Sequence, residues 1–333
     1  SPPIENRKLL AIDPGFSSGC KLAILSELGD LLEYDVMFPH PPQEKRSEAK
    51  RKILEHHKKY GFNAIVIGNG TACRETEEFI SEIIEESKLE LSYTIVSEAG
   101  ASVYSASEVA RTEFPDLDAS YRGTISIGRR LLDPMAELVK IDPKSLGVGM
   151  YQHDVSQKLL EKALHDIVES VVNHVGVDIN KASIELLSYV SGINKRVAKN
   201  IISHRQKKGI FKNREELKKV SGIGEETFKQ CAGFLKIIAG NNPLDNTAIH
   251  PESYSVCEKL LTFLEEKPEQ IITRNHIIAL KLKNTSIPST ASKLNIGEPT
   301  LKDIFENLLK PGRDPRKDVP PPIFKKGVLS MDD

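Results

Sequence analysis

Two carboxylates stand where apolar strands are expected to end. Asp13 follows Leu9–Ile12, and Glu98 follows the run Thr94–Val96 with one serine between them. The interior of a buried strand cannot solvate a charge, so an acid at its end calls for an explanation. Such a pair can hold a divalent metal ion, form a rim that contacts phosphate, or cap the helices that follow. The residues alone leave all three interpretations open.

A glycine-rich loop is the second element that could bind a ligand. It consists of Gly68, Asn69, Gly70 and Thr71, and it lies between the apolar run Ala64–Ile67 and an expected helix. The backbone N–H groups of such a loop can bind phosphate. The glycine spacing fits neither a dinucleotide-binding fingerprint nor a P-loop, and a tight strand-to-helix turn explains the loop equally well.

An internal repeat gives the strongest functional signal in the chain. Leu187–Ile193 recurs thirty positions later as Leu217–Ile223, and each copy carries Val-Ser-Gly-Ile between two expected helices. The glycine permits a tight turn, and the flanking valine and isoleucine bury it. The first N–H groups of the second helix then face outwards, where a phosphate can accept them. We interpret the repeat as a doubled helix-hairpin-helix motif that binds a nucleic-acid backbone.

The repeat lies in a basic part of a chain whose formal net charge is −1. Residues 194–236 hold twelve lysines and arginines against four acids, which favours a polyanionic partner through salt-dependent attraction. The second hairpin is the poorer of the two because Glu225 and Glu226 stand where a phosphate would come. The alternative is that the hairpins only pack domains together. The expected contact residues are Ser191, Gly192, Ile193, Lys195, Arg196, Lys199, Lys218, Lys219, Ser221, Gly222 and Gly224.

The carboxylates and the glycine loop must be positioned by alternating strands and helices. The strands are expected at 9–13, 20–25, 31–38, 64–68 and 93–96. The helices are expected at 44–59, 72–87 and 99–112, with a last helical pair within 125–141. This order begins as an antiparallel meander and ends as parallel units, so it predicts a mixed sheet with helices on both faces.

The order of elements resembles the ribonuclease-H-like fold of Holliday-junction resolvases and their YqgF-type relatives. That resemblance assigns Asp13, Glu98 and Asp133 to an acidic catalytic triad, in which two Mg²⁺ ions would clamp the oxygens of a phosphodiester. The opposing interpretation is that the three acids form turns and caps, since Asp133 precedes Pro134 in an N-cap pattern. We favour a protein that requires no cofactor, with Mg²⁺ bound only if the triad is active.

The length of 333 residues predicts two or three domains, of α/β and all-α class. The expected domains are a YqgF-like domain over 1–142, a connector with a long helix (152–175) over 143–176, a tandem helix-hairpin-helix domain over 177–240, a helical domain over 241–310, and a linker over 311–333.

Within the helical domain, the stretch 291–304 imitates a helix-turn-helix. Thr300, Lys302 and Asp303 are poor readers of base edges, so we expect this stretch to pack internally.

Longer motifs resemble the bacterial transcription accessory protein family, Tex, over almost the whole chain. They are Asp13–Gly15, Gly68–Thr71, Val96–Ser107, Phe114–Asp118, Lys140–Ser145, Tyr151–Val155, Asn242–Asp245 and Lys310–Arg316. The nearest fit is the eukaryotic branch of that family, the S1 RNA-binding domain-containing proteins. The resemblance implies binding of RNA and/or DNA in transcription or RNA metabolism, beside the transcription machinery. It also implies an N-terminal helical region and a C-terminal S1 barrel, both outside this sequence.

Composition limits the kind of protein and its location in the cell. No run approaches about 18 consecutive apolar residues, so we expect no membrane span. The four cysteines are widely spaced without a CxxC pair, which is typical of reduced intracellular thiols. We expect a monomer in the nucleus and/or cytoplasm, and the start at Ser1 indicates a piece of a longer protein. A protein-docking platform without nucleic-acid contact is the remaining alternative.

Overall fold

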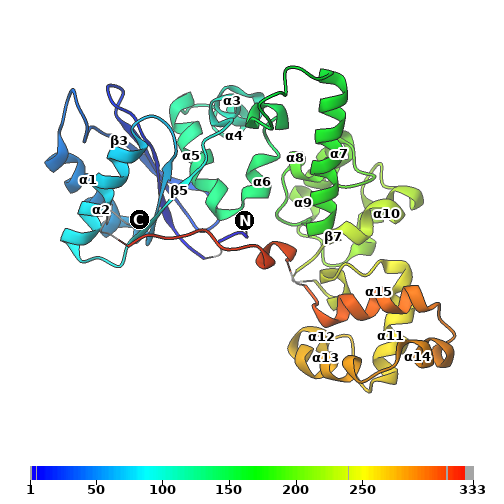
Figure 1. The fold of residues 1–333 in the computed structure, drawn as a ribbon. Coiled ribbons are helices and arrows are strands. Elements are labelled where there is room, and N and C mark those ends of the chain that lie inside the picture. The colour runs from blue at the N-terminus through cyan, green and yellow to red at the C-terminus, as the bar shows by residue number, and fades with distance from the viewer. Residues whose placement is uncertain (1, 5, 239, 313, 327–333) are drawn as a thin grey trace. The chain divides into compact units, whose positions relative to one another are not determined.

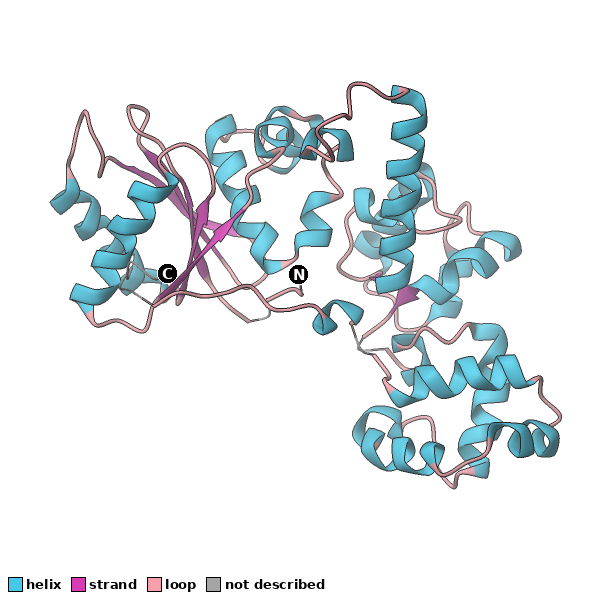
Figure 2. Cartoon of the chain, viewed as in Figure 1, coloured by secondary structure: helices cyan, strands magenta, loops and turns pink. Residues whose placement is uncertain are grey.

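The chain folds into two compact units (Figures 1 and 2). Unit 1 contains residues 1–164 and 316–333, and unit 2 contains residues 165–315, so unit 2 is inserted into the sequence of unit 1. The structure is a computed structural model that describes residues 2–4, 6–238, 240–312 and 314–326.

Unit 1 is built on a five-stranded mixed sheet. Its strands are β1 (Leu9–Asp13), β2 (Cys20–Leu25), β3 (Leu31–Met37), β4 (Ala64–Gly68) and β5 (Ser92–Val96). They lie in the order β3-β2-β1-β4-β5; the first three are antiparallel, and β4 and β5 run parallel to β1. This topology confirms the predicted ribonuclease-H-like sheet. The parallel strands end at one edge, which brings the loops after Asp13, Gly68 and Val96 to that edge.

Alternating side chains build a separate core on each face of the sheet. Leu10 and Ile12 of β1 pack with α1 and α2, whereas Leu9 and Ala11 pack against α5 (Figure 1). Gly128 allows α5 to lie close to the sheet, because a Cβ there would stand 2.9 Å from the Cβ of Ala11. The three helices are α1 (Arg46–Tyr60), α2 (Cys73–Ser87) and α5 (Ala119–Leu132).

Two helices of unit 1 differ from their predicted bounds. The helix expected at 99–112 is divided into α3 (Ala101–Ala106) and α4 (Glu108–Glu113). Between them Ser107 is extended, and its Oγ accepts the N–H of Ala110 at 3.2 Å, so this serine ends one helix and caps the next. The final helical pair consists of α5 and α6 (Pro134–Leu138). Its first helix, α5, begins at Ala119 rather than near residue 125.

Unit 2 is helical apart from a short parallel pair of strands. The long helix expected from residue 152 begins at Gln157. Before it, the N–H of Val148 donates to the side-chain oxygen of Gln152, and the side-chain amide of Gln157 donates to the carbonyl oxygen of Gln152, so these residues form a turn. The first half of unit 2 includes α7 (Gln157–Val175, whose first residues belong to unit 1), β6 (Val177–Asp178), α8 (Ile184–Leu187), α9 (Lys195–Lys208), the 3₁₀ helix η2 (Arg214–Lys219), α10 (Glu225–Cys231) and β7 (Leu235–Lys236). Its second half includes α11 (Tyr254–Phe263), α12 (Gln270–Thr273), α13 (Asn275–Lys283), α14 (Ile287–Leu294) and α15 (Glu298–Leu309).

Candidate nucleic-acid interface

The two repeated turns have the backbone that their glycines predict. Gly192 has φ +81° and Gly222 has φ +93°, a region that side chains other than glycine seldom enter. Ile193 and Ile223 are buried beneath the turns, at 4% and 5% exposure. Both glycines and Gly224 are exposed to solvent, so each turn presents its backbone at the surface.

Each turn packs against the second helix of the other hairpin. A Cβ on Gly192 would lie 2.8 Å from the Cβ of Gln230, and a Cβ on Gly222 would lie 3.2 Å from Val197 Cγ2. Asn200 of α9 also donates a hydrogen bond to the carbonyl oxygen of Ser221 at 2.7 Å. The two hairpins therefore form one module in which each helix pair fixes the position of the opposite turn.

The first turn is further anchored to α7. The N–H of Ser191 donates to Asn173 Oδ1 at 3.2 Å, and the Ser191 hydroxyl donates to Glu169 Oε1 at 2.8 Å. Ser191 is consequently engaged inside the protein. The amides of Lys195 and Arg196 open α9 and precede its first intrahelical hydrogen bond, so they are free to donate outwards.

The side chains around the first turn carry positive charge without partners. Lys195, Arg196 and Lys199 are exposed, and none of the three has a carboxylate within 4.0 Å in the part of the chain that the structure describes. The second turn differs. Lys218 donates to Glu215 at 2.9 Å, which raises the pKa of Lys218, and its ammonium lies 4.5 Å from the centre of the Phe228 ring. Lys219, also exposed, stands beside it.

Two arginines of the basic window donate to carbonyl oxygens inside the protein. Arg214 is 1% exposed and donates from its guanidinium to the carbonyl oxygens of Leu235, Ile249 and Thr247 at 2.7–2.8 Å. Arg205 likewise donates to the carbonyl oxygen of Ile179. The charge count from the sequence therefore overstates the positive surface, because these arginines hold the core together.

The acidic edge of unit 1 brings two of the three predicted carboxylates into electrostatic contact. Burial, and then the charge of Glu98, raise the pKa of Asp13 to about 6, and Lys21 opposes this shift. Lys21 lies opposite Asp13 in the β1–β2 register. The positive charge of Lys21 is therefore close enough to Asp13 to oppose the rise in its pKa, while its ammonium donates to the carbonyl oxygen of Ser18.

Glu98 also covers the glycine loop. A Cβ on Gly70 would lie 2.0 Å from Glu98 Oε1, and the N–H of Glu98 donates to Asn69 Oδ1 at 2.9 Å. Gly68, Asn69, Gly70 and Thr71 therefore form a turn that accommodates a carboxylate. A phosphate at this loop would meet the negative charge of Glu98.

Asp133 serves as a helix cap and does not join the other two acids. Its Oδ1 accepts the N–H groups of Met135 and Ala136 at 3.1 Å and a hydrogen bond from Arg316 at 2.7 Å. Within the described residues, no three histidine, cysteine or acidic side chains are grouped to hold a metal ion. Asp133 thus matches the capping interpretation, and the three-carboxylate metal site implied by the fold resemblance stays a prediction.

Two asparagines that hold the hairpin module together are not among the residues expected from the sequence. Asn194 caps α9, accepting the N–H of Val197 at 3.0 Å, and an asparagine directly before an apolar-periodic segment is a readable cap signal. Asn200 lies within α9 and gives no such signal, because its role depends on the position of the opposite turn.

Comparison with known proteins agrees with this architecture. Residues 7–132 match the Tex protein YqgF-like domain, residues 172–236 match a helix-hairpin-helix motif, and residues 242–316 match an HHH domain. The chain is 50% identical to the uncharacterized protein YdcI of Bacillus subtilis and 45% identical to the transcriptional accessory protein Tex of Neisseria gonorrhoeae. It is 39% identical to the human S1 RNA-binding domain-containing protein 1. The chain belongs to the Tex family.

These Tex relatives are longer than this chain. The alignments cover 99–100% of the chain but 46%, 43% and 38% of the Bacillus, Neisseria and human proteins. The chain spans less than half of their length, and identity to the two bacterial proteins exceeds identity to the human one. Among the described residues, no helix is long and apolar enough to cross a bilayer.

The second half of unit 2 adds an HHH domain to the Tex architecture that the sequence had suggested only as a helical domain. Leu301, Ile304 and Leu308 of α15 are buried in one core with α11 and α13. The second helix of the stretch that imitates a helix-turn-helix therefore buries one face in this core, whereas Thr300, Lys302 and Asp303 are exposed.

Proposed function

We propose that the chain binds the sugar-phosphate backbone of RNA and/or DNA through the first hairpin. The phosphate accepts hydrogen bonds from the amides at the start of α9, and the cations of Lys195 and Lys199 supply the surrounding attraction. The second hairpin supports this contact with Lys219, Gly222 and Gly224. In this proposal Ser191 positions the turn rather than touching the phosphate.

One observation carries the proposal. The exposed turn at Gly192 leads directly into a fourteen-residue helix whose first cations, Lys195, Arg196 and Lys199, have no carboxylate partner among the described residues. Unpaired cations beside free helix amides attract a polyanion without reading its sequence. The printed names of relatives, a transcriptional accessory protein and an S1 RNA-binding domain-containing protein, agree with a role inside the cell in transcription or RNA metabolism.

The test measures binding of labelled single- and double-stranded RNA and DNA by fluorescence anisotropy. Salt is varied between about 50 and 200 mM, and log K is expected to fall linearly with log salt. Lys195→Gln and Lys199→Gln should each weaken binding to every nucleic acid and reduce the magnitude of the slope by about 0.7–0.9.

Two further variants separate this contact from general charge. Lys218→Gln should have a smaller effect than Lys195→Gln, because Lys218 already pairs with Glu215. Lys58→Gln, an exposed lysine of α1 outside unit 2, should leave the slope unchanged. Equal losses from Lys58→Gln and Lys195→Gln would place the binding surface elsewhere, and absence of binding at 50 mM salt would leave a protein-docking role.

In this proposal, one copy of the chain binds the nucleic acid, and binding does not depend on a metal ion. We expect equal affinity in EDTA and in Mg²⁺ at matched ionic strength, and light scattering of the complex should give a 1:1 protein mass. Cleavage of any of the four nucleic acids in Mg²⁺ or Mn²⁺, abolished by Asp13→Asn, would instead favour the nuclease alternative.

A further inference from the structure

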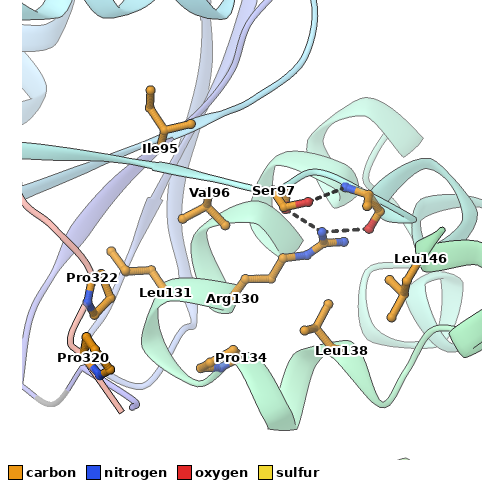
Figure 3. A pocket seen from close by; sticks show the side chains of 11 residues that line it. Ile95, Val96, Ser97, Arg130, Leu131, Pro134, Leu138, Leu146, Pro320 and Pro322 are labelled. Atoms are coloured by element: carbon orange, nitrogen blue, oxygen red, sulfur yellow. Dashed lines mark hydrogen bonds between the residues drawn. The ribbon is translucent and has the colours of Figure 1, made fainter. Parts of the chain in front are cut away.

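Unit 1 contains a cavity of about 400 Å³ that the hairpin module does not involve (Figure 3). It lies beside the end of β5, between α5, α6 and the returning C-terminal segment. Its apolar walls include Val96, Leu131, Pro134, Leu138, Pro320 and Pro322. This volume is within the range of small-molecule sites.

The polar group of the cavity is a buried guanidinium with unused donors. Arg130 is 5% exposed, and its Nη1 donates to the carbonyl oxygens of Ser97 and Ala99 at 2.7 and 2.8 Å. Its Nε and Nη2 are buried and reach no acceptor in the part of the chain that the structure describes. Figure 3 shows the side chain extending from α5 towards Ser97, with Leu138 and Leu146 facing its guanidinium.

Neighbouring acids do not satisfy these two nitrogens. Glu137 and Glu98 act on Arg130 through their charge, yet neither forms a hydrogen bond with it. Glu137 Oε2 pairs with Lys140 at 2.9 Å, and its Oε1 is itself without a partner among the described residues. Leaving buried N–H groups of a cation unpaired is unfavourable, so an acceptor is expected at this position.

We propose that this cavity binds a small monocarboxylic acid with an apolar body. The Nε–H and Nη2–H of Arg130 form a parallel pair of donors that matches the two oxygens of a carboxylate. The leucine and proline walls bury the apolar body. This site is independent of the nucleic-acid contact proposed above.

The walls favour a carboxylate over a nucleotide. Arg130 is the one cation among the described residues that line the cavity, and the remaining walls are mostly aliphatic or proline. A phosphate dianion needs more donors and charge than one guanidinium with two free N–H groups supplies. A carboxylate has one charge and two acceptor oxygens, which this guanidinium can satisfy.

The test titrates the full chain with benzoate, phenylacetate and hexanoate and follows binding by protein NMR and calorimetry. We expect at least one of them to bind with a Kd of about 1 mM or tighter and to shift the Arg130 Nε–H signal. Benzamide, which keeps the shape of benzoate without its charge, should bind at least tenfold more weakly. Guanosine monophosphate should not compete.

Two variants keep the test independent of folding. Arg130→Met should weaken benzoate binding at least tenfold, but it also leaves two carbonyl oxygens without donors. Leu138→Trp fills the cavity with an apolar side chain while keeping Arg130, and it should abolish binding in a protein whose melting temperature is retained. Lys58→Met, on the surface of α1, should bind as the unaltered chain does.

Several results would overturn the assignment. They are equal binding of benzamide and benzoate, unchanged binding in Leu138→Trp, preference for guanosine monophosphate, or no binding of the three acids at about 10 mM. A crystal structure in which one water bridges Arg130 and Glu137, with the three acids failing to enter on soaking, would show that water alone satisfies the guanidinium.

Discussion

At the residue scale, Asp13 retains its proton to a higher pH than an ordinary aspartate. Its pKa of about 6 arises first from burial at the end of β1 and then from the charge of Glu98. A raised pKa means that the folded chain holds the proton more tightly than the unfolded chain does. Ionisation of Asp13 therefore costs stability as pH rises from about 4 to 6, and the cost persists above pH 6.

Asp13→Asn should accordingly stabilise the protein at neutral pH. The shift from 3.8 to about 6 corresponds to at most about 3 kcal/mol. The gain in the free energy of unfolding should be present above pH 6, decline between pH 6 and 4, and disappear below pH 4. Urea denaturation of both proteins across this range measures it. A gain that is independent of pH would show that Asp13 ionises normally.

Asp35→Asn provides a comparison of opposite sign. Burial raises the pKa of Asp35, but hydrogen bonds from Lys52 and His56 outweigh it and hold the pKa below its usual value. Removing this carboxylate should destabilise the protein at neutral pH, and the loss should vanish as pH falls through the lowered pKa of Asp35. The two variants together separate the effect of each site from a general effect of charge.

At the element scale, the glycine of the first hairpin is required for two reasons that can be separated. Gly192→Ala introduces strain at φ +81° and also places a Cβ 2.8 Å from Gln230 Cβ. Gly61→Ala, at the left-handed end of α1 with φ +67°, meets nothing within 4 Å. We expect a loss of about 1 kcal/mol for Gly61→Ala and about 2–3 kcal/mol for Gly192→Ala.

Thermal and urea denaturation of these two variants measures the difference. Adding Gln230→Gly to Gly192→Ala removes the close contact, so the pair should show an interaction energy that Gln230→Gly and Gly61→Ala do not. Equal losses from Gly192→Ala and Gly61→Ala would mean that the opposite helix yields readily, and that the two hairpins are not one rigid module.

The elements show what pattern alone can predict. Strand order, the two glycine turns and the burial of Ile193 and Ile223 follow from local periodicity and the special backbone of glycine, and each agrees with the structure. Hydrogen-bond partners do not follow in this way. Ser191 binds a helix about twenty residues earlier, and Arg214 is buried by carbonyl groups of a later segment. Such pairings depend on tertiary contacts that a charge count cannot reveal.

At the scale of the whole molecule, the chain passes from unit 1 into unit 2 and then returns to unit 1. Residues 311–333 have the proline and charge content of a linker, which is what we expect from the sequence. Yet Arg316 pairs with Asp133 at 2.7 Å, and Lys325 forms a two-way backbone bridge with Tyr93 at 2.9 and 3.0 Å. The returning segment therefore pairs with the outer edge of β5 at Tyr93, a contact that composition does not encode.

Lys325→Pro should expose this edge. Proline removes the N–H that donates to the Tyr93 carbonyl oxygen and disfavours the remaining bond, so about 1–2 kcal/mol of local stability is expected to be lost. Hydrogen exchange should then accelerate at the Tyr93 amide by roughly tenfold. Lys325→Ala removes only the ion pair with Glu77 and should change exchange less, and Lys326→Pro favours the extended conformation that Lys325 already has. If Lys325→Pro leaves Tyr93 as protected as Lys326→Pro does, the returning segment does not hold the edge, and other contacts protect β5.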